Sequence, residues 1–181
     1  MKPEEATTPS PSPSTSLPPR TFRNAYVGLP GLLGLAVVVL DQASKWAIDR
    51  WYGFQDVTVV IPEVLNIVHV RNRGAAWGIF AEHTWLLGLL SLVCFVGLVG
   101  WFDRFTERRT YPALLAGALS GGILGNMLDR LLRSSVIDFI DVHWREVYHY
   151  PSFNVADMAI CVSIVLLVAD SLRGRRGEAS A

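Results

Sequence analysis

Two stretches of this chain decide its fold: Val136-Ile137-Asp138-Phe139-Ile140-Asp141 and Phe153-Asn154-Val155-Ala156-Asp157. Each places carboxylates beside strongly apolar residues, and the second leads directly into a long apolar run. Ionisable side chains at such places are energetically costly, so they usually mark function. We predict that Asp138 and Asp157, which are 19 positions apart, meet as an acid pair at one face of a small membrane protein.

The composition of the 181-residue chain favours one membrane domain. Hydrophobic residues make up 51% of it, and its mean hydropathy is +0.33. The length suits a single domain. The net charge is zero and no basic region stands out, so nucleic acid is not an expected partner. Cys94 and Cys161 lie inside apolar runs without metal-ligand spacing, and no metal or cofactor is expected.

Four apolar runs predict a membrane α-helical fold, a bundle of four transmembrane helices. They cover about residues 25–48, 84–102, 111–128 and 153–172, each close to the roughly 20 residues that span a bilayer. A soluble bundle with buried helices is the alternative. The first run could also be a cleaved signal peptide, but its length and its charged end favour a retained span.

The regions outside these runs are polar or rich in β-branched residues. Residues 7–19 are Thr, Ser and Pro apart from one Leu, a composition that cannot offset the entropy of ordering. We therefore predict a disordered tail over residues 1–24, a membrane domain over 25–173 and a C-terminal tail over 174–181. Two β-branched runs after the first helix predict a small β-rich segment between the first and second helices.

The distribution of basic residues predicts the orientation in the membrane. The two terminal segments and the connection between the second and third runs hold nine Lys and Arg residues, whereas the opposite connections hold five. Both termini should therefore be cytoplasmic. In that orientation the unusual polar residues of all runs converge on the extracytoplasmic interface.

The spacing of these polar residues supports the convergence. Asp41 and Lys45 are four positions apart on one helical face and can pair. Asn126 and Arg130 share that spacing, and Asn154 lies three positions before Asp157. Interfacial caps and snorkelling charges are the alternative for any one pair. The third run also carries glycines at four-residue intervals, which let membrane helices approach closely: Gly117, Gly121 and Gly125.

Five blocks, in this order, resemble the motif set of the lipoprotein signal peptidases, the signal peptidase II family. They are Asp41-Gln42-x-x-Lys45, Asn72-x-Gly74-Ala75-Ala76-Trp77, Gly121-Gly122-x-x-Gly125-Asn126-x-x-Asp129-Arg130, Val136-x-Asp138-Phe139 and Phe153-Asn154-x-Ala156-Asp157. The resemblance covers about residues 28–172 and departs from the family pattern at Trp77, where Phe is usual.

The resemblance implies an aspartic endopeptidase of the bacterial inner membrane. Its substrates would be prolipoproteins, cut just before a diacylglyceryl-modified cysteine near the extracytoplasmic face, and membrane lipids would be its other partners. The family's catalytic pair falls on Asp138 and Asp157. Its supporting residues fall on Asp41, Lys45, Asn72, Gly74, Asn126, Arg130 and Asn154. We expect the protein to act as a monomer.

The chemistry needs these residue types. Amide hydrolysis without a covalent intermediate requires an activated water and a proton donor, which two carboxylates sharing one proton supply. The three asparagines could orient the carboxylates and the scissile carbonyl. We expect Arg130 to pair with Asp129 or with a backbone carbonyl, because a cation at the dyad would spoil the shared proton. Asp129 and Asp141 are the rival catalytic acids; for Asp141 the alternative is a side chain that simply faces water.

Two other classes of membrane protein remain as alternatives. Intramembrane acids also mark the ion paths of transporters. A transporter should place polar groups at the midplane and often shows repeated halves, whereas here the cytoplasmic halves of the runs are apolar and no repeat is visible. A purely structural membrane module is the other option. A polar cluster on one side of the membrane would favour the enzyme.

Overall fold

The computed structural model describes residues 28–74, 80, 83–106, 109–145 and 147–178. The predicted N-terminal tail, Ala75 to Trp77 of the second motif and residues 179–181 lie outside the described residues. The elements are α2 (Leu29–Trp51), β1 (Val57–Ile61), β2 (Leu65–Asn72), α3 (Thr84–Gly100), α4 (Phe102–Thr106), α5 (Thr110–Arg133), β3 (Val136–Trp144), β4 (Tyr148–His149) and α6 (Val155–Glu178).

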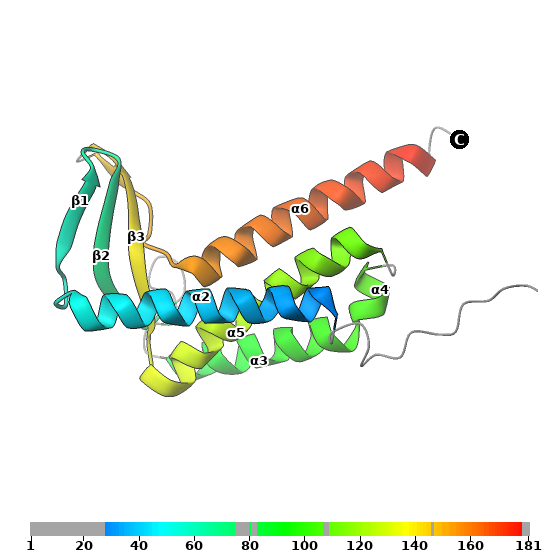
Figure 1. Cartoon of the computed structure of the whole chain (residues 1–181), viewed down its shortest axis with the longest axis horizontal. Coiled ribbons are helices and arrows are strands. Elements are labelled where there is room, and N and C mark those ends of the chain that lie inside the picture. The colour runs from blue at the N-terminus through cyan, green and yellow to red at the C-terminus, as the bar shows by residue number, and fades with distance from the viewer. Residues whose placement is uncertain (1–27, 75–79, 81–82, 107–108, 146, 179–181) are drawn as a thin grey trace, which may run out of the picture.

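The long helices form a bundle with a small sheet at one end (Figure 1). Helix α5 packs against α2, α3 and α6, and the C-terminal end of α6 lies away from the sheet. Helix α6 continues to Glu178, past the predicted domain boundary at residue 173. The polar ends of α2, α5 and α6 therefore meet beside the sheet, as the predicted convergence requires.

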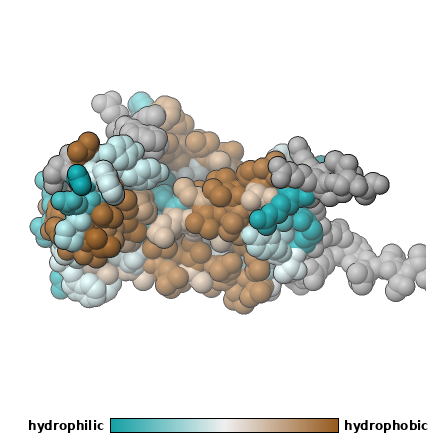
Figure 2. Space-filling model, turned by 90° about the horizontal axis from the view of Figure 1, so that it is seen from above, coloured by the Kyte–Doolittle hydropathy of each residue, from teal (hydrophilic) through white to brown (hydrophobic). Residues whose placement is uncertain are grey.

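The apolar helices carry the surface of a membrane protein. Figure 2 shows hydrophobic residues over the middle of the molecule, with hydrophilic ones gathered toward its ends. Three helices are long and apolar enough to cross a membrane: α2, α5 and the segment Val155–Arg173 of α6. Helix α3 is apolar but shorter, at 17 residues. The described residues thus contain three clear candidate spans rather than the four predicted.

The glycines of α5 allow close helix packing, as predicted. Gly117 and Gly121 lie against the backbone of α2, and a Cβ added at Gly34 of α2 would stand 2.7 Å from the carbonyl oxygen of Gly117. At Gly125 an added Cβ would lie 2.5 Å from a carboxylate oxygen of Asp41. Small residues at these positions let the helices approach closely and bring the polar end of α2 against α5.

The four strands form one antiparallel series in the order β1, β2, β3, β4. Strands β1 and β2 confirm the two strands predicted after the first helix. The sheet extends beyond that connection, because β3, which follows α5, pairs with β2. Asp138 consequently lies in a strand and not in a loop. Ile137 and Phe139 on either side of it pack against Ile48 of α2, which ties the sheet to the bundle.

Candidate active site

Asp157 is held in the first turn of α6 by a reciprocal cap. The Asp157 backbone N–H donates to Oδ1 of Asn154 at 3.0 Å, and the Asn154 N–H donates to Oδ2 of Asp157 at 3.2 Å. This exchange satisfies two backbone donors that a helix start otherwise leaves free, in the manner of a capping box. The three-residue spacing of Asn154 and Asp157 in the sequence is therefore explained by this helix cap.

Asp138 receives two amide hydrogen bonds. Asn154 Nδ2 donates to its Oδ1 at 2.7 Å, and Asn72 Nδ2 donates to its Oδ2 at 3.0 Å. Asn72 ends β2 beside β3, and its own Oδ1 accepts the N–H of Gly74 at 2.9 Å. Asn154 thus contacts both carboxylates, one through its side chain and one through the cap. The structure brings Asp138 and Asp157 to one place, as the sequence predicts.

Asn126 of α5 connects this pair to the interior. Its Nδ2 donates to Oδ1 of Asp157 at 2.7 Å. Its Oδ1 accepts from Lys45 Nζ at 2.9 Å and from Asn154 Nδ2 at 3.2 Å. With both its donor and its acceptor used, the Asn126 amide has one orientation, and it fixes Asp157 in turn.

Burial raises the pKa of the Asp138 carboxyl from its ordinary value to about 7. The main cause is the loss of water around the carboxylate, and the negative charge of Asp157 adds to it. The hydrogen bonds from Asn72 and Asn154 and the charge of Lys45 act in the opposite direction, because they stabilise the ionised form. Asp138 can therefore hold or release a proton near neutral pH.

Lys45 forms the centre of a buried ionic network below the pair. Its Nζ lies 2.8 Å from Asp41 and 2.9 Å from Asp129, and all three side chains are fully buried. The other oxygen of Asp41 accepts the backbone N–H of Ala156 at 3.0 Å, next to Asp157. The predicted pair of Asp41 and Lys45 is confirmed, and it anchors the first turn of α6.

Arg133 completes this network, a role that no sequence motif predicted for it. Its guanidinium pairs with Asp129 one helical turn earlier and donates to Oε1 of Gln42 at 3.1 Å. Two acids and two bases thus balance in this network, with Arg133 at its partly exposed edge. The four-residue spacing from Asp129 was the available signal. Gln42, part of the first motif, donates to Asp41 and Asp129 at 3.1 Å each.

Arg130 only partly follows its prediction. The expected pair with Asp129 is wrong, because Asp129 is already bound by Lys45 and Arg133. The alternative, a backbone carbonyl, is confirmed: Arg130 Nη1 donates to the Asn126 carbonyl at 3.4 Å. Contrary to the expectation that this cation stays away from the dyad, its side chain lines the same cavities as Asp157 and interacts electrostatically with Asp157 and Asp138.

The two rival acids lie in other surroundings. Asp129 is already bound by Lys45 and Arg133 in the ionic network. Asp141 is three positions from Asp138 on the same strand, and side chains alternate between the two faces of a strand. Exposure to water was one expectation for Asp141. It is instead only 8% exposed, and its carboxylate accepts a hydrogen bond from Asn66 Nδ2 at 3.0 Å.

Two cavities meet at the acid pair. The larger, of about 700 Å³, lies between α3, α5 and α6 and has mainly apolar walls. It runs from Trp101 and Gly97 to Asn126, Arg130 and Asp157. The smaller, of about 190 Å³, lies beside the sheet and is lined by Asn72, Gly74, Asn126, Arg130, Val136, Asp138, Tyr150, Pro151, Ser152, Phe153, Asp157 and Cys161. Both carboxylates therefore border accessible space next to a long apolar channel.

Comparison with known proteins gives one consistent result. The sequence profile of the Signal peptidase (SPase) II family matches residues 33–173. A lipoprotein signal peptidase of Geobacter sulfurreducens is 42% identical over 148 residues, which cover 80% of this chain and 92% of that protein. A lipoprotein signal peptidase of Bacillus velezensis is 36% identical, over 75% of this chain and 88% of that protein.

Solved structures agree with the sequence comparison. One, described as a bacterial membrane enzyme determined by the in meso method at 2.3 Å resolution, superposes with a TM-score of 0.75 at 32% identity. The alignment covers 81% of this chain and 89% of the other. A second structure with the same description at 1.9 Å resolution gives a TM-score of 0.70, also at 32% identity.

Proposed function

Because the chain belongs to the signal peptidase II family, we propose that Asp138 and Asp157 are the catalytic pair of this peptidase. The enzyme removes signal peptides from prolipoproteins, and its class is that of an aspartic endopeptidase. The observation that carries the proposal is that one residue, Asn154, contacts both acids. Its side-chain amide donates to Asp138, and its backbone N–H donates to Asp157. It holds the two acids together at one cavity.

The raised pKa of Asp138, about 7, makes it the natural holder of the shared proton. Asp157, ionised, then accepts a proton from water as the water oxygen attacks the scissile carbonyl. Asp138 gives its proton to the leaving amide nitrogen when the C–N bond breaks. Asn72, Asn126 and Asn154 hold the carboxylates, so little reorganisation is needed during the reaction.

The apolar cavity between α3, α5 and α6 is the proposed place for the lipid-bearing part of the substrate. Its walls are aliphatic over most of their length and polar only at Asn126, Arg130 and Asp157. Figure 1 shows α6 inclined away from α2 and α3 toward its C-terminal end. Diacylglyceryl chains bound there would position the adjacent peptide bond of the modified cysteine at the acid pair, so remote binding would lower the chemical barrier.

Prolipoprotein peptides without the diacylglyceryl group should therefore be cut far more slowly than lipidated ones. The rates are compared with purified enzyme in detergent, with the two peptides otherwise identical. Substituting Gly97→Leu should sharpen this test, because Gly97 lines the cavity and a Cβ there meets no atom within 4 Å. The larger side chain should fit and raise the KM of the lipidated peptide.

Gly100→Leu is the matched control for that variant. Gly100 also has open space around it but does not line the cavity. It should leave the KM unchanged. Equal cleavage of lipidated and unmodified peptides, or equal KM values for the two variants, would contradict lipid binding in this cavity.

The pH dependence of kcat/KM should reveal the shared proton. Asp138 holds its proton below about pH 7 and loses it above, so the rate should fall as the pH rises through about 7. Asn72→Ala removes a hydrogen bond that favours the ionised form of Asp138, so the pKa should rise and the alkaline limb should move to higher pH. A limb that stayed in place or moved to lower pH would contradict this assignment.

The arrangement in the membrane is part of the same proposal. The domain 25–173 has four spans, and a single chain is the working unit. Both termini are cytoplasmic, and the acid pair lies near the extracytoplasmic face. The bias of nine basic residues against five supports it, and the 17 residues of α3 are near the lower limit of about 17 for a span. Reporter fusions after Arg109 and Ala181 should read cytoplasmic, and one near Glu63 extracytoplasmic. An extracytoplasmic signal at Arg109 would reverse the assignment.

A further inference from the structure

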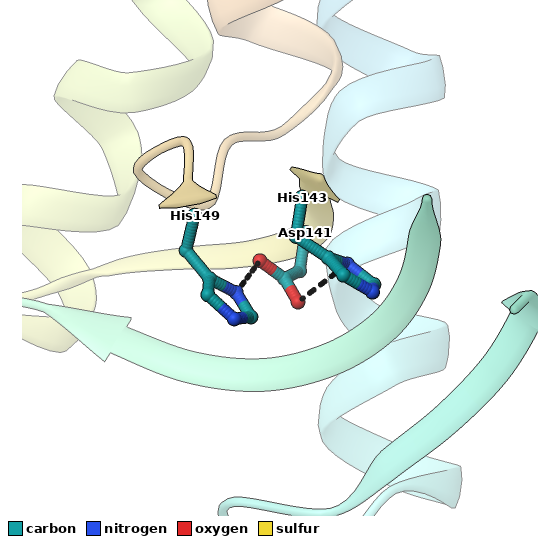
Figure 3. A group of neighbouring side chains, drawn as sticks. All are labelled: Asp141, His143 and His149. Carbon is teal, nitrogen blue, oxygen red and sulfur yellow. Dashed lines mark hydrogen bonds and ion pairs between the residues drawn. The ribbon is translucent and has the colours of Figure 1, made fainter. Parts of the chain in front are cut away.

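A second cluster of ionisable side chains lies on the sheet, apart from the acid pair (Figure 3). It consists of Asp141, His143 and His149, and one ligand atom from each lies within 4.8 Å of the others. The proposed peptidase mechanism uses none of them. Asp141 and His143 are buried, whereas the His149 side chain is 51% exposed.

The backbone brings the three residues to one face. Asp141 and His143 are two positions apart on β3, so their side chains point to the same side of the sheet. His149 on β4 is the direct antiparallel partner of His143. The two imidazole rings stack with centroids 5.0 Å apart and planes inclined by 13°. Figure 3 shows both rings beside the carboxylate of Asp141.

We propose that Asp141, His143 and His149 bind a divalent first-row transition metal ion, with Zn²⁺ as the best match. The Asp141 oxygens lie 3.6 Å from Nδ1 of His143 and 3.4 Å from Nδ1 of His149. The His149 contact is a long, weak hydrogen bond, and the His143 contact is too long to be one. Both separations are close to the roughly 3.4 Å between ligands that each stand about 2.1 Å from a tetrahedral zinc ion. Because the two rings are nearly parallel, the exposed His149 ring would turn out of the stack to bring its lone pair to the ion.

Asn66 fixes the carboxylate of this cluster. Its Nδ2 donates to Oδ2 of Asp141 at 3.0 Å and lies 3.5 Å from Nδ1 of His143. The longer contact is too long to occupy the single lone pair of Nδ1, which is free for a metal ion in the tautomer protonated at Nε2. The bond to Oδ2 leaves this oxygen a second lone pair for the ion. Asn66 is thus an outer partner that orients Asp141.

The ion would connect β4 to β3 close to the smaller cavity. Strand β4 has only two residues, Tyr148 and His149. The chain that follows it, Tyr150 to Phe153, lines the cavity that contains Asp138 and Asp157. The exposed His149 offers entry from solvent and leaves room for water as a fourth ligand. Imidazole with carboxylate suits Zn²⁺, whereas Mg²⁺ prefers oxygen ligands alone.

Zinc binding to the purified full-length protein tests the proposal. The protein is freed of its histidine tag, stripped with a chelator and titrated with Zn²⁺ at pH 7.5 by calorimetry, and its Tm is followed in parallel. One ion should bind per chain, with a saturable rise in Tm that Mg²⁺ does not produce. Co²⁺ in place of Zn²⁺ should give the visible absorption of a four- or five-coordinate site.

His149→Ala should weaken zinc binding by more than about tenfold, the loss typical even of an outer partner. His83→Ala is the control, because His83 is an exposed histidine before α3 that lies outside the cluster. It should bind zinc as the wild type does. If His149→Ala does not fold, Asp141→Asn tests the same site by removing its anionic ligand. Absence of saturable one-to-one binding in the wild type, or unchanged binding in the cluster variants, overturns the proposal.

Discussion

Replacing Asp138 with Asn should remove nearly all turnover of a lipidated prolipoprotein peptide. The Asn side chain keeps the size of Asp and can still accept one of the two hydrogen bonds from Asn72 and Asn154, but it cannot donate and recover a proton. Asp157→Asn should have the same effect. The two acids act as one unit, so the double variant should be barely slower than either single one.

Measurements of substrate binding and of Tm distinguish a loss of catalysis from unfolding of the variant. The substrate Kd should change little. The Tm should be unchanged or higher at pH 8, because the wild-type carboxylate is then ionised at a buried position, as its raised pKa of about 7 indicates. Asp56→Asn, at an exposed carboxylate outside the cavities, is the control and should keep full activity. Chelators should leave wild-type turnover intact.

A residual rate above about a tenth would mean a loss below roughly 1.4 kcal/mol of barrier. Such a result for Asp138→Asn would exclude Asp138 as a catalytic acid. The shared-proton mechanism would then be wrong as a whole, because Asp129 is bound in the ionic network and Asp141 lies on the other face of β3.

Replacing Lys45 with Met should severely destabilise the protein. It removes the cation between Asp41 and Asp129 while both carboxylates remain fully buried. Breaking a buried pair in this way typically costs about 3–5 kcal/mol, because the remaining charge is uncompensated. The Tm in detergent should fall sharply, and activity should fall with it because Asp41 anchors Ala156 beside Asp157.

Arg71→Met is the matched control for Lys45→Met. Arg71 pairs with Asp49 at 2.7 Å, but their side chains are 45% and 36% exposed. Exposed pairs contribute only about 0–1 kcal/mol, so this variant should keep its Tm. Adding Asp41→Asn to Lys45→Met should recover part of the lost stability by restoring the charge balance. A Tm drop no larger than that of Arg71→Met would show that the network is not needed for folding.

Several features of this protein follow from short stretches of sequence. The apolar helices are visible as runs because span length and hydropathy are local properties. The pair of Asp41 and Lys45 follows from helical spacing, and so does the cap of Asn154 on Asp157. The glycines of α5 predicted its close contact with another helix, because only small side chains fit between closely packed helices. The remaining site residues were predicted from their resemblance to the family motifs.

Tertiary structure decided the rest, because strand pairing joins segments that are distant in the chain. Asp138 meets Asn72, 66 positions earlier, only when β3 adds to β2. Asp129 was expected to pair with its neighbour Arg130; helical spacing gives it Arg133 instead, and the packing of α2 on α5 gives it Lys45. The histidines showed no metal-ligand spacing, yet the register of β3 and β4 places His143 and His149 together beside Asp141. Register depends on which side chains are buried across the whole sheet, and short sequence motifs do not contain that information.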